Sequence, residues 1–136
     1  MEKTRVFIGL LGTDQHELGA VAVSRILRDA GFEVVYGGRF NIPEGIVKTA
    51  VEEDVDVIGL SCHSWEYLHY APRLLELLKE RNLKIPVMVG GSVITPGDTR
   101  DLRSMGVAAA FGPSATPEEI VGAIHRIAKK ARSHKD

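Results

Sequence analysis

Cysteine is almost absent from this sequence of 136 residues, in which Cys62 stands alone. One cysteine cannot form an internal disulfide, and so low a content suits a reducing compartment, so we expect a cytoplasmic protein. Long apolar runs are missing too, because no stretch approaches the ~18 residues that a membrane span requires. Residues 1–5 carry charges and lack the apolar core of a signal peptide, so the sequence predicts a soluble protein with no membrane partner.

An excess of charge of one sign is also absent. Seventeen lysine and arginine residues balance eighteen aspartate and glutamate residues, so charge predicts no nucleic-acid partner. The only basic concentration is the tail at about residues 129–136, which we expect to be a solvated, fraying end. What the sequence does have is a hydrophobic content of 44%, enough for one domain over residues 1–136 that folds without metal or disulfides.

Short apolar runs alternate with amphipathic helical patterns along the chain. Within most runs the apolar residues follow one another without alternating with polar residues, which is typical of parallel strands buried on both faces. They lie at residues 6–11, 33–36, 55–60, 86–89 and 108–111. This alternation predicts an α/β, flavodoxin-like (Rossmann-like) doubly wound sheet of five parallel strands, with strand order 2-1-3-4-5 and helices on both faces.

Ligands in such sheets bind outside the carboxyl ends of the strands, at the point where the strand order reverses. Here that point lies between the first and third strands. An Asp-x-His-x-x-Gly run follows the first strand at residues 14–19, and the third strand ends in Ser61. The fourth strand ends in Gly90 and Gly91, whose lack of side chains leaves a slot beside Ser61. We therefore expect one ligand site at this edge.

The run at residues 14–19 has the pattern of a metal-bound histidine. His16 could ligate a metal through one imidazole nitrogen while Asp14 accepts a hydrogen bond from the other, which fixes the tautomer. Gly19 would let a bulky group lie close to the backbone. Taken alone, however, one His near one Asp is more often an ordinary loop pair, and two glycines after a strand are a common turn.

Three common functions of this fold require residues that this chain lacks at the corresponding positions. A phosphorylated receiver domain needs an Asp at the end of the third strand, where this chain has Ser61. A flavodoxin needs a hydroxyl-rich phosphate cradle after the first strand, but that loop has Thr13 as its one hydroxyl and the carboxylate of Asp14, which would repel phosphate. A dinucleotide fold needs a Gly-x-Gly-x-x-Gly turn, which residues 9–12 do not supply.

The three motifs, in this order and at these places, resemble the cobalamin-binding domain of vitamin B12 enzymes over about residues 5–127. The resemblance implies that His16 replaces the cofactor's dimethylbenzimidazole as the lower ligand of cobalt, with Asp14 as its hydrogen-bond partner. It also implies that the displaced nucleotide tail threads between the first and third strands. The expected cofactor-binding residues are Gly12, Thr13, Asp14, Gln15, His16, Gly19, Ser61, His63, Gly90 and Gly91.

Within this family, residues 30–36, 52–61, 74–81 and 105–108 look most like acyl-CoA mutases of the methylmalonyl-CoA, isobutyryl-CoA and 2-hydroxyisobutyryl-CoA type. The resemblance implies adenosylcobalamin as cofactor and a large TIM-barrel subunit that binds acyl-CoA as partner in a hetero-oligomer. In such enzymes the radical chemistry belongs to the cofactor. This chain would supply the axial ligand of an isomerase and would not be active alone.

The chain departs from the mutase pattern at four positions. The mutases usually have Lys, Gly and Arg where this chain has Leu10, Gln15 and Leu18, and they have a Leu where it has His63. Two alternative hypotheses therefore remain open. One is a corrinoid methyl carrier or cobalamin sensor, although methyl carriers usually have a preceding helical bundle. The other is a small subunit of the glutamate mutase type.

An aromatic and imidazole cluster follows the third strand, within residues 63–70. It includes His63, Trp65 and Tyr67. Its functional interpretation is a surface facing the corrin ring or a partner subunit, and the alternative is the packing of a loop and a helix start.

Overall fold

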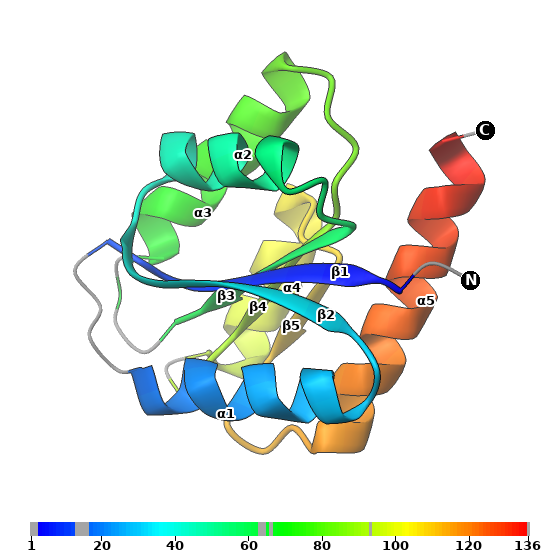
Figure 1. Ribbon diagram of the computed structural model, residues 1–136. Coiled ribbons are helices and arrows are strands. Elements are labelled where there is room, and N and C mark those ends of the chain that lie inside the picture. Colours follow the sequence, from blue (N-terminus) through cyan, green and yellow to red (C-terminus); the bar gives the residue numbers. More distant parts are fainter. Residues whose placement is uncertain (1–2, 13–16, 63–64, 66, 93, 136) are drawn as a thin grey trace.

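A computed structural model of the chain describes residues 3–12, 17–62, 65, 67–92 and 94–135. Over these residues, strands and helices alternate (Figure 1). The strands are β1 (Arg5–Leu11), β2 (Glu33–Asn41), β3 (Val57–Ser61), β4 (Val87–Gly90) and β5 (Ala109–Phe111). The helices are α1 (Glu17–Asp29), α2 (Pro43–Glu52), α3 (Tyr67–Glu80), α4 (Pro96–Met105) and α5 (Pro117–Lys135).

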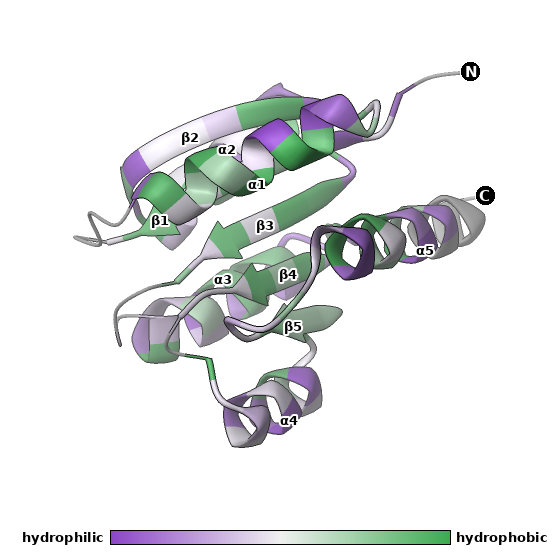
Figure 2. Ribbon diagram, turned by 90° about the horizontal axis from the view of Figure 1, so that it is seen from below, coloured by the Kyte–Doolittle hydropathy of each residue, from purple (hydrophilic) through white to green (hydrophobic). Residues whose placement is uncertain are grey.

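The sheet is parallel throughout, with the order β2-β1-β3-β4-β5. The predicted fold class and strand order are therefore confirmed. Helices α1 and α5 cover one face of the sheet, and α2, α3 and α4 cover the other (Figures 1 and 2). Among the described residues, no helix combines the length and the apolar character needed to cross a membrane.

Each central strand contributes to two cores, because successive side chains point to opposite faces. In β1, Val6, Ile8 and Leu10 pack under α1 and α5, whereas Phe7 and Leu11 pack under α2 and α3. This two-sided burial explains why the strands appear in the sequence as continuous apolar runs.

Helix α4 shows how local residues set the ends of an element. Thr95 accepts a hydrogen bond from the amide of Asp98 at 3.1 Å, and the Asp98 carboxylate accepts one from the amide of Thr95 at 2.9 Å. This reciprocal capping box starts the helix. Gly106 ends it with a φ of +116°, a left-handed conformation that favours glycine.

Strand β2 is longer than the sequence predicted. Strand β2 continues to Asn41 instead of ending at residue 36, because Gly37 and Gly38 interrupt the apolar pattern while the pairing with β1 continues through register shifts. Helix α5 extends through the basic stretch after residue 128 to Lys135. Alanine, lysine and arginine are strong helix formers, which explains the continuation.

Candidate functional site

The carboxyl ends of four strands meet in one row at the edge of the sheet. In this row Leu10 of β1 is in register with Ser61 of β3, Ser61 with Gly90 of β4, and Gly90 with Phe111 of β5. Alternation along the strands directs all of these positions toward the face covered by α1 and α5. The glycine of β4 therefore lies beside the serine of β3, as the sequence predicted.

A pocket of about 120 Å³ lies over this row, between the sheet and helices α1 and α5. Gly19 from α1 and Ile120 from α5 contribute to its walls, and Ser61, Gly90 and Gly91 contribute to its sheet side. The structure thus brings together four residues that were predicted for one site from three distant segments. Most of the lining is apolar.

The two consecutive glycines of the predicted slot have different roles. A Cβ atom at Gly90 would meet nothing closer than 3.7 Å, so it would make only ordinary van der Waals contacts within the pocket. A Cβ atom at Gly91 would lie 1.6 Å from the carbonyl oxygen of Cys62. Two backbone segments approach so closely at position 91 that only glycine fits there. No contact within the free chain requires glycine at position 90.

Sequence analysis missed several pocket residues. Gly59 lies one row inside Ser61 on the same face, and a Cβ atom there would lie 2.7 Å from Cδ1 of Ile8. A glycine inside a buried strand is a signal of close approach, and this signal could have drawn attention to Gly59 in the sequence. Met88 and Phe111 also line the pocket, but their sequence pattern is that of ordinary core residues.

The predicted residues Thr13, Asp14, Gln15, His16 and His63 lie outside the described residues. Within the part of the chain that the structure describes, no group of three or more His, Cys, Asp or Glu side chains could hold a metal ion.

Gly12, which precedes the predicted ligand loop, is fixed to strand β2 and does not line the pocket. Its amide donates a hydrogen bond to the carbonyl oxygen of Asn41 at 2.7 Å. The Asn41 side-chain amide donates in turn to the carbonyl oxygens of Leu10 and Gly38, each at 2.9 Å. The end of β1 is thus held at two points by a single residue of β2.

Glu17, which follows the predicted ligand loop, is also held by β2. The Tyr36 hydroxyl donates a hydrogen bond to Oε1 of Glu17 at 2.7 Å, and Arg39 Nε forms an ion pair with Oε2 at 3.5 Å. Burial, together with the hydrogen bond to Glu17, raises the pKa of Tyr36 to about 12. Both ends of the loop at residues 13–16 are therefore anchored to the same strand.

We expect Tyr36→Phe to lower the free energy of unfolding by about 1.5 kcal/mol at pH 8, since a hydrogen bond to a carboxylate is lost. The raised pKa means that Tyr36 stabilises the fold fully below pH 10 and loses this effect between pH 10 and 12. Burial raises the pKa of Tyr67 to about 12 as well, so the variant should keep part of the alkaline decline. Urea unfolding from pH 8 to 12 measures both effects, with Tyr70→Phe as control. Unchanged stability and an unchanged pH slope would contradict this role.

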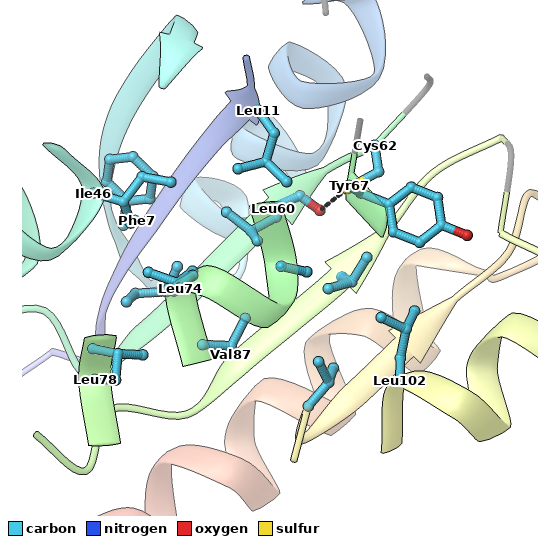
Figure 3. Close-up of a cluster of buried hydrophobic side chains, with 14 of the residues drawn as sticks. Phe7, Leu11, Ile46, Leu60, Cys62, Tyr67, Leu74, Leu78, Val87 and Leu102 are labelled. Atoms are coloured by element: carbon cyan, nitrogen blue, oxygen red, sulfur yellow. Dashed lines mark hydrogen bonds between the residues drawn. The ribbon is translucent and has the colours of Figure 1, made fainter. Parts of the chain in front are cut away.

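The aromatic cluster after β3 divides into a buried and an exposed part. Tyr67 is 1% exposed and packs in the core beside Cys62, whose thiol donates to the carbonyl oxygen of Leu60 at 3.9 Å (Figure 3). Trp65 is 61% exposed, and the His69 ring is exposed and meets Tyr70 edge-on at 5.1 Å. The packing interpretation therefore holds for Tyr67, while Trp65 is free to contact a partner.

Comparison with known proteins identifies a family. The model of the B12 binding domain matches residues 4–122. The 2-hydroxyisobutanoyl-CoA mutase small subunit of Aquincola tertiaricarbonis is 36% identical over 123 residues, which are 90% of this chain and 90% of that protein. The pivalyl-CoA mutase small subunit of Xanthobacter autotrophicus is 37% identical over 96% of this chain and 88% of that protein. Methylmalonyl-CoA mutase of Escherichia coli is 37% identical over 82% of this chain, which is 16% of that protein.

Solved structures share the fold. A cobalamin-binding protein from Desulfitobacterium hafniense superimposes with a TM-score of 0.78 at 20% identity, over 93% of this chain and 60% of that chain. The receiver domain of the putative response regulator NarL from Mycobacterium tuberculosis superimposes with a TM-score of 0.72 at 22% identity, over 95% of this chain and 98% of that chain. At these identities the likeness shows the fold alone.

Proposed function

The chain belongs to the B12-binding domain family, and from this premise we propose that it is the cobalamin-binding small subunit of an adenosylcobalamin-dependent acyl-CoA mutase. The observation that carries the proposal is the pocket in which Gly19, Ser61 and the two glycines after β4 converge. Two relatives that match over nearly their whole length are mutase small subunits. A cytoplasmic location is part of the proposal.

The described residues fit the nucleotide tail of cobalamin. The pocket floor lacks a side chain at Gly90, which leaves a slot for a flat ring, whereas the side chain of Ile8 fills the space beside Gly59. Apolar walls such as Met88 and Phe111 suit an aromatic base, and the Ser61 hydroxyl offers a polar contact. The end of the slot lies at the carboxyl edge of the sheet, where the loop at residues 13–16 also begins.

In this proposal the chain binds and orients the cofactor. His16 would ligate cobalt, and Asp14 would fix the imidazole tautomer. Gly12 and Glu17 keep the two ends of their loop in place through β2. Adenosylcobalamin, when bound, supplies the radical chemistry of the rearrangement. The acyl-CoA site would belong to a large TIM-barrel subunit in a hetero-oligomer.

We expect the purified chain to bind cobalamin and to show no mutase turnover by itself. Mixed with its large subunit and adenosylcobalamin, it should form a complex on size-exclusion chromatography and isomerise a short branched or hydroxylated acyl-CoA. The large subunit with adenosylcobalamin but without this chain is the control and should be inactive. Turnover by the isolated chain would overturn the proposal.

The same assay separates the alternatives. Complex formation with a methyltransferase in place of a mutase subunit would favour a corrinoid methyl carrier. Isomerisation of an amino acid would favour a small subunit of the glutamate mutase type.

A further inference from the structure

The corner that joins β2 to α2, at residues 39–42, combines backbone strain with exposed apolar side chains. Phe40 has a φ of +67°, in the left-handed region that a bulky residue rarely adopts. Phe40 is nevertheless 61% exposed, and Ile42 is 49% exposed. Burial of the ring therefore does not offset the backbone strain at Phe40. Strain without such an offset points to a role in contact with another molecule.

Two other described residues that are not glycine have positive φ, and each has a local reason. Asp54 (φ +51°) and Asn82 (φ +54°) lie just past the ends of α2 and α3. In both cases the next amide bonds to a carbonyl five residues earlier, as in the Schellman motif that ends many helices. Asp and Asn also tolerate this conformation. Phe40 neither follows the end of a helix nor belongs to the residue types that tolerate a positive φ.

The bulge of β2 explains the backbone conformation but not the phenylalanine. It turns Asn41 back toward β1, where its side chain bonds to Leu10. Glycine or asparagine at position 40 would allow the same turn with less strain. Within the chain the Phe40 ring meets the Arg39 guanidinium at 5.3 Å, an exposed contact that contributes little.

The corner lies on the same edge of the sheet as the pocket. The Asn41 carbonyl accepts a hydrogen bond from the amide of Gly12, so the end of β2 lies next to the end of β1 (left side of Figure 1). Two other exposed apolar side chains come from segments that reach this edge, Leu18 at the start of α1 and Trp65 after β3. A partner that approaches the cofactor pocket from this edge would meet these side chains.

We propose that the corner at residues 39–42 is a docking point for the large mutase subunit, and that the Phe40 ring inserts into an apolar pocket of that subunit. The proposal rests on the proposed function. In the E. coli methylmalonyl-CoA mutase the matching segment is 16% of one long polypeptide, so it is covalently joined to the rest. A separate chain must hold its partner through surface contacts, and buried aromatic residues dominate such contacts.

The test replaces Phe40 by glycine, which removes the ring and relaxes the backbone. We expect the isolated Phe40→Gly chain to melt at a higher temperature and to bind cobalamin as before, while its Kd for the large subunit rises at least about ten-fold. Phe40→Asn, which also tolerates a positive φ, should weaken the complex equally. Asn82→Gly relaxes a left-handed position at the end of α3, away from this edge, and should leave the complex unchanged.

The outcomes distinguish this proposal from the one on which it rests. If the unaltered chain binds cobalamin and the large subunit, and both Phe40 variants bind that subunit equally well, the docking point is wrong and the proposed function stands. If the unaltered chain binds cobalamin but no large mutase subunit, both proposals fail.

Discussion

Replacing Gly90 by leucine should lower the affinity for cobalamin by about 100-fold or more while the chain remains folded. A side chain at this position points into the pocket of about 120 Å³, beside Ser61 and Phe111, and would fill the slot proposed for the nucleotide tail. The fold should tolerate the change because the nearest atom to a Cβ is 3.7 Å away. Isothermal titration with cobalamin measures the affinity, and circular dichroism confirms folding.

The neighbouring variant Gly91→Ala should have the opposite result, a destabilisation of about 3 kcal/mol or more. Its Cβ would collide with the Cys62 carbonyl, and that segment cannot easily move because the Cys62 amide donates to the Gly90 carbonyl at 2.7 Å. Gly45→Ala is the control, since a Cβ at this helical position meets nothing within 4 Å. Normal cobalamin binding by Gly90→Leu would place the nucleotide tail elsewhere.

The fold could be predicted because its strands are buried on both faces. A segment such as residues 6–11 is apolar at nearly every position, and this distinguishes it from the amphipathic helices on either side. The prediction failed at the end of β2, where Gly37 and Gly38 carry no apolar signal. Pairing with β1 continues there through backbone hydrogen bonds, which the side chains do not reveal.

The candidate site could be predicted in part because topology determines which strand ends meet. Ser61 and Gly90 are distant in sequence, yet the strand order places them in register. Met88 and Phe111 could not be assigned to the site, because an apolar side chain looks the same whether it fills a core or lines a pocket. The strain at Phe40 was equally hidden, since it depends on a bulge and not on residue type.

The proposed cobalt ligand lies between two anchored points, and this gives the last prediction a structural basis. Gly12 and Glu17 flank the loop at residues 13–16, and both are hydrogen-bonded to β2. In general, a short segment whose two neighbours are held has fewer conformations to lose than a segment with a free end. Binding cobalt from such a loop requires less ordering than binding from a free segment, which favours affinity.

We expect His16 to bind cobalt in place of dimethylbenzimidazole. Electron paramagnetic resonance of the cob(II)alamin complex with nitrogen-15-labelled protein should therefore show coupling to a labelled imidazole nitrogen. His16→Ala should abolish this coupling, and Asp14→Asn should weaken cobalamin binding by about 10- to 100-fold because a neutral amide replaces the charged carboxylate as hydrogen-bond partner of the imidazole. His125→Ala is the control, since this exposed histidine lies on helix α5, outside the predicted ligand loop, with its ring tilted against that of Phe32 at 4.8 Å. Coupling only to the unlabelled nitrogen of the cofactor would show that dimethylbenzimidazole stays on cobalt, and His16 would then have no place in the coordination sphere.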